Sequence, residues 1–325
     1  MTGIGRTVFS LAAMLIALVV TAAGGPAFAQ TSDYPARKIT FIVGFAPGGG
    51  IDVLARGVAQ ELSEQFGYQM VVENRPGAAS NIAAKVVASA PPDGYTLLVT
   101  GNSFAINQTL SKDLTYSADE LRAVAFPTTD NHSLAVNADS STPTLLDFIA
   151  MAKAKPVSAA VGGSSSHIVA DYVLKVVAKT QTTSVPFESG APAMNALLGH
   201  HVEILAAPVV EVFAQAQQGR VRALAVTGSK RSRALPDVPT LTEAGFPGLE
   251  INGWVGVLAP AKTPPEICTK LNEAINAVVT RQSFNERLRS LGYEPNTMAL
   301  GDAEPFLKSS IEIWRRMILA TGLAD

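Results

Sequence analysis

Short apolar runs alternate with segments of helical periodicity along most of the chain. The run 39–43 is typical of a strand buried on both faces, and it stops at a proline and three glycines, residues 47–50. From Asp52 to Phe66 apolar side chains recur every fourth residue, which predicts a helix that Gly67 caps. Strand, glycine loop and helix together bring backbone N–H groups and the positive end of a helix dipole to one point. This arrangement suits a phosphate or a carboxylate.

The same alternation continues and predicts two α/β sets, and the short connections favour a parallel sheet in the first set. Its other strands are expected at 70–73, 95–100 and 123–126, with a helix from Ser80, the expected N-cap, to Ser89. The second set has expected strands at 133–136, 157–161, 183–187, 202–206 and 221–227, and helices at 144–154, 167–179, 191–198 and 209–218. A last strand at 254–259 precedes three helices at 264–279, 283–291 and 302–320, which we expect to pack on the first sheet.

Segments rich in Gly, Ser and Asn follow several of these strands. Ligands of open α/β sheets bind at the carboxyl ends of the strands, so these loops are expected to line one cleft between two lobes. The connections 126–133 and 252–255 would then act as hinges. The loops are 46–50, 101–103, 162–166 and 188–190.

The N-terminal stretch, up to Ala29, resembles a targeting segment. Arg6 is its only charge, residues 8–20 are apolar, and Ala27-Phe28-Ala29 is an A-x-A cleavage pattern. We interpret residues 1–29 as a secretory signal peptide cleaved after Ala29, which predicts a soluble, periplasmic product. A membrane anchor is the alternative, but the apolar run is shorter than the roughly 18 to 20 residues that a spanning helix needs.

Composition narrows the function classes. The chain has 325 residues, enough for two domains after cleavage, and its formal net charge of −2 argues against a nucleic-acid partner. Cys268 is the only cysteine, so no intrachain disulfide is possible, and the four histidines lack the i, i+4 spacing of a helical zinc pair. We therefore expect neither a metal nor a cofactor.

The usual catalytic and nucleotide motifs do not occur. No Lys-Ser or Lys-Thr follows Gly50, and neither G-x-G-x-x-G nor G-x-S-x-G is present at the relevant loops. Ser164, Ser166 and His167 lie close in sequence, but adjacent Ser and His do not face each other on a helix. Two structural alternatives stay open: the glycines serve only a tight turn, or the serines only cap the helix at His167. Asp52 is unfavourable beside an anion unless it caps its own helix or meets a cationic group on the ligand.

Seven motifs together resemble the Bug-type periplasmic receptors of tripartite tricarboxylate transporters. They are PGGGID at 47–52, ENRPGA at 73–78, PDGYTLL at 92–98, VPFESGAPA at 185–193, RALAVT at 222–227, LPDVPTLTEAGFPG at 235–248 and GWVGVLAPAKTP at 253–264. The resemblance implies an α/β, two-lobed type II periplasmic-binding-protein fold with a ligand cleft between the lobes and two crossover strands. It also implies a small carboxylate ligand and delivery to a permease of large and small membrane subunits.

The resemblance also indicates which residues bind the substrate. The first glycine loop is expected to hold one carboxylate through backbone groups and ordered waters, and loops of the second lobe oppose it. The chain departs from the family pattern at Phe187-Glu188-Ser189, where Tyr-Lys-Gly is more usual, so a ligand with an amine or an aromatic body becomes an alternative to a dicarboxylate. The predicted substrate-binding residues are Phe45, Pro47, Gly48, Gly49, Gly50, Asp52, Gly101, Asn102, Ser103, Gly163, Ser164, Ser165, Ser166, His167, Phe187 and Ser189.

These observations predict a monomeric solute receptor without enzymatic activity. The first lobe is expected to comprise residues 30–129 and 255–325, and the second lobe is expected to comprise residues 130–254. Two alternatives are a receptor that presents its ligand state to a membrane sensor kinase, and a serine hydrolase that uses Ser166 or Ser164.

Overall fold

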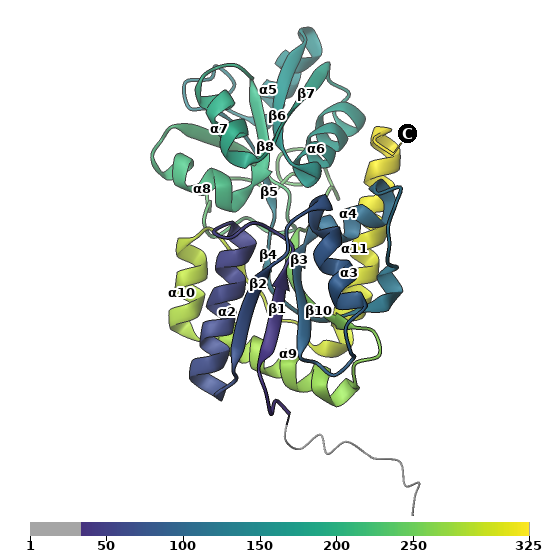
Figure 1. Cartoon of the computed structure of the whole chain (residues 1–325). Helices are drawn as coiled ribbons and strands as arrows, with labels where there is room; N and C mark the ends of the chain where they lie inside the picture. The colour runs from purple at the N-terminus through teal and green to yellow at the C-terminus, as the bar shows by residue number, and fades with distance from the viewer. Residues whose placement is uncertain (1–33, 325) are drawn as a thin grey trace, which may run out of the picture. The chain divides into compact units, whose positions relative to one another are not determined.

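The structure is a computed structural model that describes residues 34–324. The expected signal peptide, residues 1–29, and its cleavage site lie outside the described residues. The body that follows contains two β-sheets, each with helices on both faces (Figure 1).

The first sheet has six strands in the order β11-β4-β10-β3-β1-β2. Strands β1, β2 and β3 are parallel to one another, whereas β10 is antiparallel to both β3 and β4. The parallel arrangement expected for the first set of strands is confirmed for β1, β2 and β3, and the later strand β10 enters antiparallel on the return from the second sheet. The strands are β1 (Ile39–Val43), β2 (Met70–Asn74), β3 (Thr96–Gly101), β4 (Leu121–Thr129), β10 (Trp254–Pro260) and β11 (Glu294–Pro295).

The second sheet has five strands in the order β7-β6-β8-β5-β9. Strand β6 is parallel to β7 and β8, while β5 is antiparallel to β8 and β9. The strands are β5 (His132–Asn137), β6 (Val157–Gly162), β7 (Thr182–Phe187), β8 (Ile204–Pro208) and β9 (Val221–Val226). All five were expected from the sequence.

The helices of each lobe divide between the faces of its sheet. In the first lobe α2, α9 and α10 pack together, and α3, α4 and α11 lie across the sheet from them (Figure 1). In the second lobe α5, α6 and η5 contribute to one apolar cluster, and α7 and α8 to another. The helices are α2 (Gly50–Phe66), α3 (Asn81–Ala88), α4 (Asn102–Leu110), α5 (Leu145–Ala154), α6 (Ser164–Ala170), α7 (Gly190–Leu198), α8 (Val209–Gln217), α9 (Pro265–Thr280), α10 (Gln282–Ser290) and α11 (Leu300–Thr321), with 3₁₀ turns η3 (Ala78–Ser80) and η4 (Ala118–Glu120) and the π-helical turn η5 (Asp171–Val177).

Helix α2 ends as its sequence predicts, but α3 begins differently. Gly67 adopts the left-handed conformation, with φ at 70°, and its N–H bonds back to the last turn of α2. Ser80 occupies the N-cap position of α3 at a positive φ of 79°, and its side chain makes no capping bond. Its hydroxyl instead lies 3.2 Å from that of Thr100 on β3. Ser80 is therefore the N-cap as predicted, but its hydroxyl faces the sheet instead of bonding to the helix.

The C-terminal helices contact more than the first sheet. Helix α9 packs on β4 and on α2, and α11 packs on β4 and α4, as expected. However, α11 also contacts α6 and η5 in the second lobe. The expected packing of this block on the first sheet is thus confirmed, and the apolar stripe of α11 is long enough to reach the second lobe as well. Trp314 is buried along it, and the Trp254 indole donates to the Ser310 hydroxyl at 2.7 Å.

The chain passes between the sheets twice, and the two passages are bonded to each other. Residues 130 and 131 connect β4 to β5, and the segment 227–253 connects β9 back to β10. The Asp130 N–H donates to the Gly253 carbonyl at 2.9 Å, and the Gly253 N–H donates to Oδ1 of Asn131 at 3.1 Å. The Asn131 carbonyl accepts from the N–H of Val209, which extends the connection to α8.

Gly253 should not tolerate a residue with a side chain at this point. A Cβ there would overlap the carbonyl oxygen of Asp130, so Gly253→Ala is expected to lower the free energy of unfolding by about 1–3 kcal/mol or more. In Gly301→Ala, the matched control in the first turn of α11, a Cβ meets no heavy atom within 4 Å. We expect that variant to be as stable as the parent or slightly more so, because Ala favours helix over Gly. Urea denaturation of both variants measures the difference, and equal stabilities would contradict the packing argument.

Candidate functional site

The loop after β1 is an exposed glycine turn. Residues 46–50 are exposed, and Gly48 has a positive φ of 81°, which glycine adopts without strain. Gly49 is the N-cap of α2 and carries no side chain to occupy the N–H groups of the first helical turn. An anion at this point would meet those N–H groups and the positive end of a helix of 17 residues.

Asp52 supports this loop through hydrogen bonds. Its side chain is 2% exposed, and Oδ2 accepts from the Gly48 N–H at 2.8 Å and from Nε of Arg56 at 3.0 Å. Oδ1 accepts from the Asn74 amide at 2.8 Å, and the same amide donates to the Phe45 carbonyl. Burial by itself would raise the pKa of Asp52, but these bonds outweigh it and the pKa is lowered. The carboxylate is therefore ionised and compensated, and it holds the loop rather than facing the place of an anion.

Gly101, Asn102 and Ser103 lie where β3 runs directly into α4. A Cβ on Gly101 would approach Ile51 and the Trp254 carbonyl at 3.2 Å each, so this turn touches both the glycine loop and the second crossover. The Asn102 side chain is buried, and its Oδ1 accepts from the Trp254 N–H at 3.0 Å. Within residues 34–324 the buried hydroxyl of Ser103 has no hydrogen-bond partner.

The segment 162–166, which we call the serine loop, leads into helix α6 of the second lobe. Gly163 has a φ of 113°, and Ser164 to His167 already belong to the helix, so the serines do not cap a helix that begins at His167. That alternative is wrong because the glycine itself makes the turn. Ser165 contacts His132 of β5, with 3.2 Å between the hydroxyl and Nε2. Burial lowers the pKa of His132 to about 4, so its imidazole is neutral near pH 7.

His167 pairs with Asp171, which lies one helical turn later. Nε2 of His167 lies 3.5 Å from Oδ2 of Asp171, whose Oδ1 is bound by Lys175 at 2.8 Å and by the Ser184 hydroxyl. Burial would raise the pKa of Asp171, but the bonds from His167, Lys175 and Ser184 lower it to about 2. This buried carboxylate joins the end of α6 to β7.

The turn after β7 carries Phe187 and Ser189 and packs tightly on the serine loop. A Cβ on Gly162 would lie 2.5 Å from the backbone N of Gly190, so the two loops touch through their backbones. Glu188 and Ser189 are exposed on this turn. Ser189 is the N-cap of α7, and its side chain makes no capping bond.

The structure brings the predicted loops to the facing ends of the two lobes. Helix α4, which follows Gly101 in the first lobe, packs against α6 of the second (Figure 1). Gly101 in turn touches the glycine loop, and Gly162 touches the turn after β7. Sequence reasoning missed Asn74, Arg56 and His132, which support these loops. Of these three residues, only Arg56 could be recognised from the sequence, because it lies four residues after the acidic Asp52.

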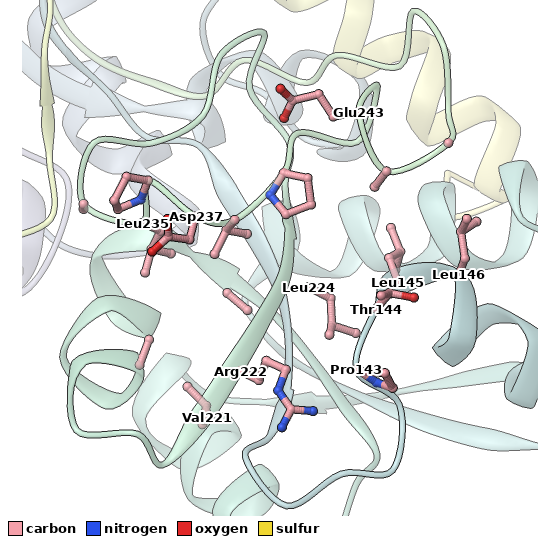
Figure 2. A pocket seen from close by; sticks show the side chains of 18 of the residues that line it. Pro143, Thr144, Leu145, Leu146, Val221, Arg222, Leu224, Leu235, Asp237 and Glu243 are labelled. Atoms are coloured by element: carbon pink, nitrogen blue, oxygen red, sulfur yellow. The ribbon is translucent and has the colours of Figure 1, made fainter.

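A pocket of about 720 Å³ lies elsewhere, within the second lobe. Figure 2 shows apolar side chains such as Leu145, Leu224 and Leu235 on its walls, with Arg222 among them. The Arg222 guanidinium is engaged by the carbonyl oxygens of Ser140 and Ala138. None of the predicted site residues lines this pocket. The motif at 235–248 therefore builds this pocket and not the cleft.

Residues 34–324 hold no group of three or more His, Cys, Asp or Glu side chains able to bind a metal ion, and none of their helices is long and apolar enough to cross a membrane. In the same part of the chain no carboxylate accepts a hydrogen bond from the His132 ring, as a Ser–His–Asp site requires.

Comparison with known proteins agrees with this geometry. Residues 54–323 match the model of the tripartite tricarboxylate transporter family receptor. The chain belongs to this family. The receptor is 34% identical to a UPF0065 protein of Bordetella bronchiseptica over 325 residues, covering 99% of this chain and 94% of the relative. It is 30% identical to the protein BugT of Bordetella pertussis over 315 residues, covering 95% and 96%.

Two solved structures similar to the receptor contain carboxylates. Rpa4515 of R. palustris with adipate has a TM-score of 0.79 and 31% identity, and it covers 89% of this chain and 99% of its own. MatC from Rhodopseudomonas palustris with bound malate has a TM-score of 0.74 and 29% identity, and it covers 88% and 100%. The receptor thus has the two-lobed type II fold of the Bug-type receptors.

The buried Asp171 should make the stability of the receptor sensitive to acid. Its pKa of about 2 in the folded state lies below the ordinary 3.8, so its contribution is present above about pH 4 and is lost as the pH falls toward 2. A pKa lowered this far corresponds to about 2 kcal/mol of stability. We expect the unfolding free energy of Asp171→Asn to fall less than that of the parent over this range. The exposed Asp139→Asn serves as control, and parallel curves for parent and Asp171→Asn would contradict the assignment.

Removing the charge of Asp52 should loosen the glycine loop. Asp52→Asn places an amide against the donors of Gly48, Arg56 and Asn74, so we expect a loss of about 2 kcal/mol in the unfolding free energy. Arg56→Gln removes only the half-exposed partner and should cost at most about 1 kcal/mol. Urea denaturation distinguishes the two variants. An Asp52→Asn variant no less stable than Arg56→Gln would show that the loop does not depend on this carboxylate.

Proposed function

We propose that this receptor binds a small organic acid between its lobes and delivers it to a tripartite tricarboxylate-type permease with a large and a small membrane subunit. One observation carries the proposal: an exposed glycine turn at the start of α2, whose N-cap has no side chain, in a family whose solved relatives contain adipate and malate. Backbone N–H groups at this point suit a carboxylate without any cationic side chain.

The negative charge of Asp52 would repel an anion bound at this turn, but that charge is already compensated by its hydrogen-bond partners. Its charge is bound by Arg56, Gly48 and Asn74 and is buried, so it does not face the exposed side of the turn. We propose that Gly48, Gly49 and Gly50 hold the carboxylate, that Phe45, Pro47 and the turn at Gly101 border it, and that the serine loop and the turn after β7 close on it. Asp52 and Asn102 act through the backbone that they hold.

The first lobe is proposed to comprise residues 30–129 and 255–325, and the second lobe is proposed to comprise residues 130–254. The bonded crossovers at Asp130 and Gly253 are the proposed hinge, since they are where the chain passes between the sheets. Closure over a ligand changes the shape that a permease meets, which is how the bound state is distinguished. The receptor is proposed to act as a monomer in the periplasm, after removal of residues 1–29.

Uptake is favoured over signalling because the matched family is named for a transporter. A sensor-kinase partner remains the alternative, and a neighbouring gene for a multispanning permease or for a kinase separates the two. Hydrolysis of generic esters that is lost in Ser166→Ala would overturn the assignment as a receptor.

The proposed carboxylate site is tested at Gly49. A thermal-shift screen of organic acids first identifies a compound that stabilises the receptor by mass action. Gly49 has a φ of −70° and a Cβ there meets only ordinary contacts, so Gly49→Asp should fold normally. We expect it to weaken binding of that acid by tenfold to about a hundredfold, measured by calorimetry.

Gly49→Asn is the matched control, because it adds the same bulk without the charge. It should bind the acid more tightly than Gly49→Asp does. Unchanged affinity in Gly49→Asp would reject this loop as the site, and a screen in which no organic acid stabilises the receptor would reject the ligand class.

A further inference from the structure

Strand β9 has one edge that is mostly unpaired. The second sheet ends at β9, which pairs with β5 on its other side. On that paired side the Arg220 carbonyl accepts from the Ala138 N–H at 3.1 Å. Because bonding alternates along an antiparallel ladder, the N–H and C=O groups of Val221 and Ala223 point to the open side. Within residues 34–324 no strand and no loop bonds to them there.

The chain itself covers only the far end of this edge. The Val226 N–H donates to the Pro239 carbonyl at 2.9 Å, and the Val226 carbonyl accepts from the Leu241 N–H at 3.0 Å. Thr240 thus lies beside Val226 in a parallel bridge. Before Pro239 the chain bends away through two turns, each closed by an N–H···O bond between residues three apart. The place of a sixth strand is therefore filled at one end of β9 and open along the rest.

The pocket of about 720 Å³ surrounds the open part of this edge. Residues 221–224 line it, and of these Ala223 belongs to an apolar cluster beside α8, whereas Leu224 belongs to the cluster beside α5. A pocket that reaches both faces of a strand lies at the edge of that strand. Figure 2 shows Leu145 on one side of β9 and Leu235 on the other. The pocket thus combines apolar walls with unpaired backbone groups.

Two other edge strands carry a residue that prevents further pairing. Strand β7, at the opposite edge of the same sheet, contains Pro186, and β11, at an edge of the first sheet, contains Pro295. Proline has no N–H to offer to an added strand. Strand β9 contains neither proline nor lysine, and the guanidinium of its Arg222 is held by the carbonyl oxygens of the segment after β5. This edge therefore stays able to accept a strand.

We propose that this pocket is a docking site for an extended peptide segment of another protein, which adds to β9 as a strand. An extended peptide supplies donors and acceptors at the spacing of the Val221 and Ala223 backbone groups. A helix or an acyl chain would cover these groups without bonding to them, which costs free energy.

The walls of the pocket define the side chains of the segment. Successive side chains of an added strand point to the two faces of the sheet, and both faces are apolar here. The partner segment is therefore apolar on both faces, with side chains such as valine and alanine. None of the predicted substrate-binding residues lines the pocket, so this site is separate from the cleft.

The experiment uses short synthetic peptides as probes. The first is a capped peptide of alternating valine and alanine with a lysine at each end for solubility, and a panel replaces the valines by isoleucine, leucine or phenylalanine. NMR of the ¹⁵N-labelled receptor follows the amides of Val221 and Ala223. At saturating peptide we expect both amides to shift and to exchange with solvent about tenfold more slowly, or slower still. A peptide methylated at every amide nitrogen cannot donate and should bind about tenfold more weakly.

Ala223→Pro makes the corresponding change in the receptor. It removes an N–H that points to the open side, so the bonds between β9 and β5 are kept. We expect peptide binding to fall about tenfold. Ala223→Ser is the matched control, because it keeps the N–H and almost the same size, and it should bind the peptide as the parent does. Thermal unfolding verifies that both variants are folded, and the methylated peptide provides the same test on the unchanged receptor.

Three results would overturn the docking site. No peptide of the panel slows the exchange of the two amides, the methylated peptide binds as tightly as its parent, or decanoate fills the pocket while the peptides do not. The last result would show a site for apolar small molecules. Each leaves the proposed carboxylate site at Gly49 unaffected, because the affinity of the receptor for its organic acid is measured separately and should be unchanged in Ala223→Pro.

Discussion

The bonded pair of crossovers is the constraint on which the rest of the molecule depends. Two sheets with separate helical layers share one body because the Asp130 N–H and the Asn131 side chain both bond to Gly253. Asn102 extends this junction to the start of α4, and the Asn131 carbonyl extends it to α8. The polar groups of one passage are thus hydrogen-bonded to the backbone of the other passage. The loops at both sheet edges face each other because the passages are held at this point.

Buried carboxylates in this receptor are compensated by several donors. Asp52 and Asp171 are buried, and each has at least one cation and further donors, so the bonds outweigh the cost of burial and the carboxylates stay ionised. These two carboxylates hold neighbouring segments in place.

Most elements were predictable from periodicity, because apolar runs such as 39–43 and the fourth-residue pattern of α2 report burial directly. Helix α4 was missed since Asn102 and Ser103 resemble a loop, and the helical pattern after them is short. The antiparallel entry of β10 depends on a partner far away in sequence. The motifs indicated the glycine and serine loops, but Asn74 and His132 emerged only when β2 and β5 were placed beside them.

Helix α11 has a consequence for how the lobes move. It contacts β4 and α4 on one lobe and η5 on the other, so the lobes meet at a second place besides the crossovers. A rotation of the second lobe relative to the first would therefore have to move α6 and η5 along the surface of α11. The π-helical turn at Asp171–Val177 lies at this contact.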